Sequence, residues 1–112
     1  MRPSSTHQSD PPDRVLVIGA TGKTGSRAVR ALRRRGIRVR AASRRSSLPA
    51  ERFEWHDDRT WRPALHDVDA VYVTYQPDLA VPGAAAAVGA LAGMAARRGV
   101  PRLVLLSGRG EP

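Results

Sequence analysis

The sequence predicts an α/β fold built on a doubly wound parallel sheet. Short apolar runs alternate with helical segments along the 112 residues, a glycine-rich turn follows the first run, and no internal repeat is visible. Such alternation forms a parallel sheet with helices as right-handed crossovers. We expect a single domain with five strands in the order 3-2-1-4-5. A ligand crevice is expected beyond the carboxyl ends of strands one and four.

Each element follows from local composition. Apolar, β-branched or aromatic runs predict strands at residues 15–18, 37–43, 52–55, 70–75 and 102–106. Residues 24–35 show an apolar stripe opposite an arginine stripe, which predicts an amphipathic helix that ends at Gly36. A short helical turn is expected within residues 57–68, where Asp57 and Asp58 are expected to cap it, and a long helix over residues 82–98.

The strongest motif is the junction between the first strand and the first helix. Residues 14–25 read RVLVIGATGKTG, with Gly19, Gly22 and Gly25 spaced three apart. A helix N-terminus with unpaired N–H groups suits the pyrophosphate of a dinucleotide. Gly19 would allow the sharp turn, Gly22 the close approach of the phosphates, and Gly25 the packing of helix on strand.

Two other interpretations compete for this turn. Gly22-Lys23-Thr24 ends like the phosphate loop of ATPases, but that motif needs a glycine where Val17 stands, so Lys23 is not expected to be a Walker lysine. A tight turn with no functional meaning is the other alternative. The flanking strand and amphipathic helix favour dinucleotide binding.

The end of the second strand predicts which dinucleotide is bound. NAD-binding proteins place an acid there, whereas this chain has Ser43-Arg44-Arg45 and no acid before Glu51. Guanidinium groups would hold a 2′-phosphate that a carboxylate would repel. We therefore expect NADP, with NADPH preferred over NADH. The alternative is two solvated loop arginines in an arginine-rich chain.

Three further residues are candidates for cofactor contact. Glu54 could accept from the adenine amino group, or be a surface acid beside Trp55. Tyr75 and Ser107 end the fourth and fifth strands and point toward the crevice, where either could touch the nicotinamide half; for Tyr75, strand-end packing is the alternative. The histidines lack metal-ligand spacing, so no metal site is expected.

Composition limits the remaining functions. The formal charge is +9, Lys23 is the only lysine, and arginines are spread over every segment with few aromatic residues, so nucleic-acid binding is the less favoured alternative. The absence of cysteine excludes disulfides and fits a cytoplasmic protein. Residues 1–13 are expected to be a disordered leader, and residues 79–96 a helix on the sheet rather than a membrane span.

Four blocks, residues 15–25, 39–44, 69–73 and 103–110, resemble the NmrA-like branch of atypical short-chain dehydrogenases/reductases, which are NAD(P)-binding Rossmann proteins. The resemblance covers nearly everything from Arg14 onward. It implies pyrophosphate contacts from the loop residues and 2′-phosphate contacts from Arg44 and Arg45. It implies an adenine contact at Glu54, where the family usually has Asp. The pyrophosphate set is Gly19, Thr21, Gly22, Lys23, Thr24 and Gly25.

The resemblance also implies an activity and shows a departure from the family. Members include NADPH-dependent oxidoreductases of quinones and other small acceptors, and non-catalytic redox-sensing regulators. The chain stops at Pro112, so it looks like an N-terminal half, and its Tyr residues lack the lysine of a Tyr-x-x-x-Lys pair. Part of the sheet face should then be uncovered and drive homodimer formation. The candidates for that surface are Val71, Val73, Val104 and Leu106.

Overall fold

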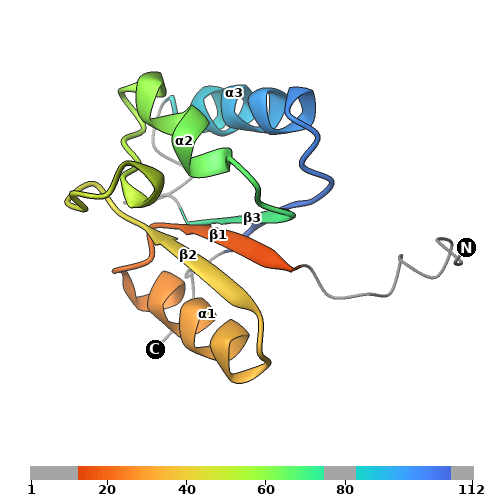
Figure 1. The fold of residues 1–112 in the computed structure, drawn as a ribbon. Coiled ribbons are helices and arrows are strands. Elements are labelled where there is room, and N and C mark those ends of the chain that lie inside the picture. The colour runs from red at the N-terminus through yellow and green to blue at the C-terminus, as the bar shows by residue number, and fades with distance from the viewer. Residues whose placement is uncertain (1–12, 75–82, 107–112) are drawn as a thin grey trace, which may run out of the picture.

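A computed structural model describes residues 13–74 and 83–106 (Figure 1). Its strands are β1 (Arg14–Ile18), β2 (Arg38–Ala42), β3 (Ala70–Val73) and β4 (Leu103–Leu105). Its α-helices are α1 (Lys23–Arg34), α2 (Trp61–Leu65) and α3 (Ala84–Arg97). Two short 3-10 turns, η2 (Pro49–Glu51) and η3 (Asp58–Thr60), lie between β2 and α2.

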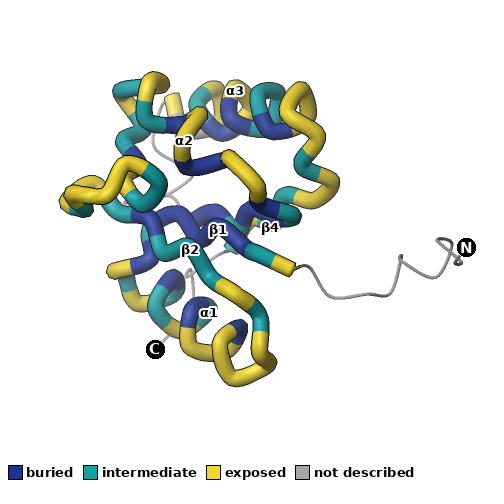
Figure 2. Tube along the Cα trace, in the orientation of Figure 1, coloured by how far each residue is buried: buried dark blue, intermediate teal, exposed yellow. Residues whose placement is uncertain are grey.

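The four strands form one parallel sheet in the order β2-β1-β3-β4. β1 lies in the centre, and its residues from Val15 to Ile18 are almost fully inaccessible to solvent (Figure 2). A continuous apolar run is what a strand covered on both faces requires. The expected α/β class with a parallel sheet is confirmed, and the glycine turn lies at the carboxyl end of its central strand.

Helix α1 covers one face of the sheet, and α2 and α3 cover the other (Figure 1). Val15 and Val17 of β1 pack with Val29 and Leu32 of α1. On the opposite face Leu16 and Ile18 pack with residues of α2 and α3, including Leu65 and Leu91. The predicted amphipathic stripe of the first helix therefore faces the core, while its arginines face solvent.

The expected third strand at residues 52–55 does not form, so the five-strand order is not confirmed. This segment makes a single parallel bridge, between Ser43 and Arg52. Beyond it, the backbone of Glu54 bonds to its own loop: its N–H donates to Thr60 Oγ1 at 3.0 Å, and its carbonyl accepts from Trp61 Nε1 at 2.9 Å. These bonds from Thr60 and Trp61 tie the Glu54 backbone to the start of α2, in place of further pairing with β2.

The prediction that Val71 and Val73 lie on an uncovered surface is wrong. Both are buried, because in β3 they share the face that α2 and α3 cover. The opposite face carries Tyr72 and, paired with it across β3 and β4, Val104, and both are partly exposed. The error is one of strand parity, since successive side chains point to opposite faces. Leu105 in β4 is the most exposed apolar residue of the sheet, at 48%.

Helix α3 packs on the sheet, as expected of its apolar composition. Leu91 and Ala95 are buried in the core that it forms with β3. Gly89 is exposed, so the small residues are not all used for close packing. Within residues 13–74 and 83–106, no helix is long and apolar enough to cross a bilayer.

Candidate functional site

A cavity of about 640 Å³ opens at the carboxyl end of β1. Parallel α/β sheets bind ligands at this edge, where helix N-termini and loops meet. Several predicted residues line the cavity, and other residues complete its wall. The predicted ones are Gly19, Thr21, Gly22, Arg44 and Glu54, and the others are Ile18, Ser43, Phe53, Trp55, His56 and Thr74.

Gly19 forms the turn out of β1 and is locked to the end of β3. Its φ of +81° is a left-handed conformation that favours glycine. A Cβ added here would collide with Thr74 Oγ1 and lie 3.0 Å from the Thr74 carbonyl oxygen. The buried Thr74 hydroxyl donates to the carbonyls of Ile18, at 2.8 Å, and Gly19, at 3.3 Å. Thr74 therefore fixes the path of the loop.

The N-terminus of α1 is open toward an anion. Its N-cap is Gly22, no side chain caps it, and its first turn holds no acid. The first intrahelical bond runs from the Ser26 N–H to the Gly22 carbonyl, at 2.8 Å, so the preceding N–H groups have no acceptor within the helix. Lys23 adds a cation where the helix dipole is already positive. A bound diphosphate would make both features favourable.

Gly25 has a packing role in this arrangement. It is buried in the first turn of α1, and a Cβ there would collide with the Gly19 carbonyl oxygen. The helix thus approaches the loop more closely than any other residue would allow. Lys23 and Thr24 lie in the same turn, exposed and half-buried, but neither lines the cavity.

Arg44 adds a positive charge to the cavity wall. Arg44 is exposed and lines the cavity directly after β2, whereas Arg45 is exposed and does not line it. Ser43 is held in place by two bonds to the following segment: its N–H donates to the Glu51 carbonyl at 2.9 Å, and its carbonyl accepts from the Phe53 N–H at 3.0 Å. Of the two predicted arginines, the structure therefore brings Arg44 to the cavity and leaves Arg45 outside its lining.

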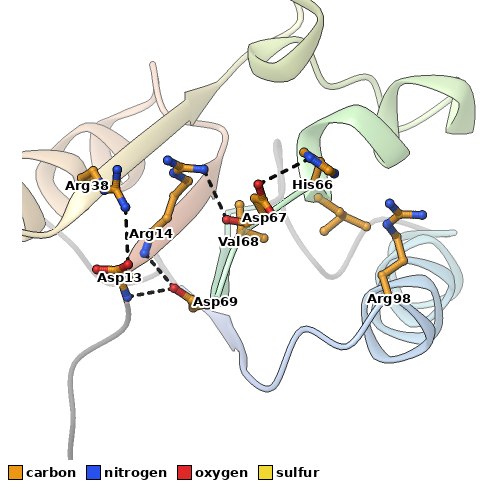
Figure 3. Close-up of a pocket in the computed structure, with 9 residues that line it drawn as sticks. Asp13, Arg14, Arg38, His66, Asp67, Val68, Asp69 and Arg98 are labelled. Carbon is orange, nitrogen blue, oxygen red and sulfur yellow. Dashed lines mark hydrogen bonds and ion pairs between the residues drawn. The ribbon is translucent and has the colours of Figure 1, made fainter.

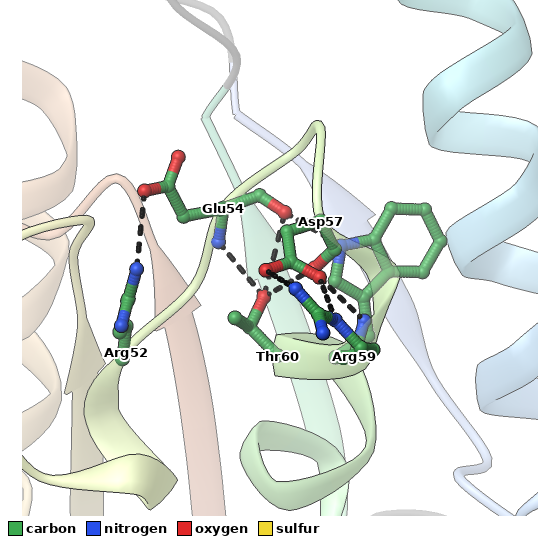
Figure 4. A network of polar contacts seen from close by, with 6 residues as sticks. Arg52, Glu54, Asp57, Arg59 and Thr60 are labelled. Atoms are coloured by element: carbon green, nitrogen blue, oxygen red, sulfur yellow. Dashed lines mark hydrogen bonds and ion pairs between the residues drawn. The ribbon is translucent and has the colours of Figure 1, made fainter.

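The aromatic residues Phe53 and Trp55 form part of the cavity wall. Phe53 stacks on Trp61 with ring centroids 5.7 Å apart, and Trp55 meets Phe53 edge-to-face at 5.0 Å. The carboxylate of Glu54 forms an ion pair with Arg52, with 3.6 Å between Nη2 and Oε2 (Figure 4). In the same network Asp57 caps η3, as expected, by accepting from the Arg59 N–H at 3.1 Å. The side-chain bond from Arg59 lowers the pKa of Asp57.

Two predicted contacts lie outside the described residues. These are Tyr75 and Ser107, the candidates for the nicotinamide half of a cofactor. Thr74 and Phe53 line the cavity without having been singled out from the sequence. A polar residue that closes an apolar strand was the available signal for Thr74, and Phe53 carried none beyond its place next to Glu54.

A second cavity, of about 500 Å³, lies at the opposite edge of the sheet (Figure 3). Several of its charged residues contact one another: Arg38 lies 3.4 Å from Asp13, and Asp69 Oδ2 accepts the backbone N–H groups of Asp13 and Arg14. Nearby, Arg40 donates to the carbonyls that end α2, at 2.8 Å to Ala64 and 2.6 Å to His66. These contacts connect the start of β1 to β2 and α2 to β2 at this edge of the sheet.

Comparison with known proteins agrees with the geometry. A family model described as NAD(P)H-binding matches residues 19–110. An uncharacterized oxidoreductase of Bacillus subtilis (strain 168), YesF, is 36% identical over 63 residues, covering 53% of this chain and 22% of its own length. The crystal structure of a proposed exported protein from Burkholderia pseudomallei matches with a TM-score of 0.65 and 30% identity, over 87% of this chain and 48% of its own. The chain thus spans less than half of either protein.

Proposed function

The chain belongs to the NAD(P)H-binding family, and from that premise we propose that it binds NADP(H), with NADPH preferred over NADH. The pyrophosphate would lie on the loop from Gly19 to Gly25 and the N-terminus of α1. The 2′-phosphate would bind Arg44. The observation that carries this proposal is that one cavity is lined both by the uncapped N-terminus of α1, at Gly22, and by Arg44.

The test is isothermal titration calorimetry of NADPH and NADH against wild type and Arg44→Ala. A charge-assisted hydrogen bond contributes about 1.5–3 kcal/mol, so the substitution should weaken NADPH about 10- to 100-fold. NADH affinity should change by about twofold or less, because NADH has no 2′-phosphate to lose a partner. Arg34→Ala, at the far end of α1, is the matched control for loss of one positive charge. Equal weakening of both nucleotides would contradict the assignment of Arg44.

We propose hydride transfer by an oxidoreductase as the activity, with this domain as the part that binds the cofactor. The acceptor would be a small organic molecule such as a quinone. The oxidoreductase label of YesF, a relative whose length this chain covers only in part, supports this class. The dinucleotide would supply the hydride, and the chain's own residues would bind and orient it.

A non-catalytic redox sensor of the same fold is the second candidate. The lack of a Tyr-x-x-x-Lys pair in the sequence favours it. NADPH consumption in the presence of quinones would support the oxidoreductase, whereas tight binding without turnover would support the sensor.

We propose the cytoplasm as the compartment of this protein. The word "exported" describes the Burkholderia protein and is not carried over to this chain. We also propose that the chain self-associates through the sheet face that carries Tyr72 and Val104.

A further inference from the structure

Arg52 and Glu54 form a charged pair beside the cavity. Arg52 Nη2 lies 3.6 Å from Glu54 Oε2, and the two side chains are 50% and 30% exposed (Figure 4). Glu54 lines the cavity, but its carboxylate is turned toward Arg52. The acid is therefore already engaged by a cation in this structure.

The backbone places Arg52 next to the end of β2. Ser43 and Arg52 form a parallel bridge, secured by the bonds from Ser43 to Glu51 and Phe53. Side chains of residues paired across parallel strands lie on the same face. Arg52 thus stands beside Ser43, and Arg44 is the next residue along the chain. Ser43 and Glu54, the residues that Arg52 bridges and pairs with, both line the cavity, so Arg52 stands beside its wall without lining it in this structure.

The ion pair is weak enough to exchange its partner. A pair at this distance with half-exposed side chains contributes little to stability. A phosphate monoester carries almost two negative charges and three acceptor oxygens, and the planar guanidinium fork matches its geometry. We propose that Arg52 is a second 2′-phosphate-binding residue, that Glu54 holds it in position until the phosphate arrives, and that this pair adds to the preference for NADPH that Arg44 provides.

This inference rests on the proposed binding of NADP(H), but it assigns Glu54 a different role from an adenine contact. If Glu54 accepts from the adenine amino group, Glu54→Gln weakens every adenine nucleotide. If Glu54 competes with the phosphate for Arg52, the same substitution strengthens only the nucleotides that carry a 2′-phosphate. The two roles predict opposite signs for one measurement.

The experiment titrates the chain with 2′,5′-ADP and with AMP, which differ only in the 2′-phosphate, at one fixed salt concentration. Arg52→Ala should weaken 2′,5′-ADP about 10-fold and change AMP by about twofold or less. Glu54→Gln should strengthen 2′,5′-ADP about threefold and leave AMP unchanged. Arg62 is an exposed arginine on α2, so Arg62→Ala controls for the loss of one positive charge. It should change the affinity for neither ligand.

Circular dichroism melting shows which variants are folded. If Arg52→Ala does not fold, Arg52→Lys replaces it in the titrations. Lysine keeps the charge without the planar fork, so an intermediate loss for 2′,5′-ADP is expected. Equal effects of Arg52→Ala on both ligands, or weaker binding of both by Glu54→Gln, would overturn this inference and leave NADP(H) binding intact. A folded wild type that binds neither ligand, nor NADPH or NADH, would instead remove the proposed function.

Discussion

Substitution of Gly19 tests how tightly the nucleotide loop is held. Gly19→Ala adds a Cβ that collides with Thr74 Oγ1, at a residue with φ of +81°. Gly36→Ala is a matched control, because Gly36 has φ of +79° and an added Cβ would meet none of the described atoms within 4 Å. The pair separates the cost of the backbone conformation from the cost of the collision.

The magnitudes follow from these two geometries. A left-handed conformation costs a non-glycine residue about 1–2 kcal/mol, which is the loss expected for Gly36→Ala. Overpacking adds about 1–3 kcal/mol, so Gly19→Ala should lose about 2–5 kcal/mol of unfolding free energy. Gly19→Ala should also weaken NADPH, since the loop must move away from Thr74, whereas Gly36→Ala should leave NADPH affinity unchanged.

Urea denaturation followed by circular dichroism measures both losses, and the slope shows whether unfolding stays two-state. The double variant Gly19→Ala/Thr74→Ala should regain part of the loss. The regain should be incomplete, because the Thr74 carbonyl oxygen still lies 3.0 Å from the added Cβ. Equal losses for Gly19→Ala and Gly36→Ala would refute the contact between loop and β3, as would additivity of the Gly19 and Thr74 changes.

Three further outcomes follow from the fold. Arg40→Met should lower the unfolding free energy by about 1–3 kcal/mol, because the carbonyls that end α2 lose a charged donor, whereas Arg38→Met, in an exposed pair, should change it by about 0.5 kcal/mol or less; urea titration checks both. Asp57→Asn should lower the melting temperature at pH 7, and the difference should shrink as the pH falls below about 4: the folded pKa is depressed, so the stabilisation is present above the unfolded value and is lost through the folded one. In analytical ultracentrifugation, wild type should self-associate at high concentration and Val104→Lys should not; a wild-type monomer throughout would contradict association through this face.

The first half of the fold could be predicted because its signals are local. Val15 to Ile18, the glycine turn and the arginine stripe of α1 each determine one element, and Gly36 ends that helix as expected. The segment around Glu54 could not be predicted in this way. Its strand-like composition is overridden by bonds from Thr60 and Trp61, which are visible only when the chain is folded.

Tertiary context also decided which cavity residues were missed. The contact of Thr74 with Gly19 joins residues 55 apart in sequence, and no local pattern indicates it. The choice between Arg44 and Arg45 depends on which of them faces the cavity, and the exposed loop sequence carries no periodicity to decide it. The prediction for Val71 and Val73 failed because alternation along β3 places them opposite Tyr72, on the face that α2 and α3 cover.

The tryptophans at the cavity allow its occupancy to be followed by intrinsic fluorescence. The chain has two tryptophans: Trp55 lines the cavity, and the buried Trp61 stacks on the lining residue Phe53, with the two indole centroids 6.0 Å apart. Their intrinsic emission therefore originates from a single region, and a reduced nicotinamide bound nearby would quench it by energy transfer. Indole fluorescence should thus follow occupancy of the cavity in unlabelled protein, while remaining insensitive to events at the opposite edge of the sheet.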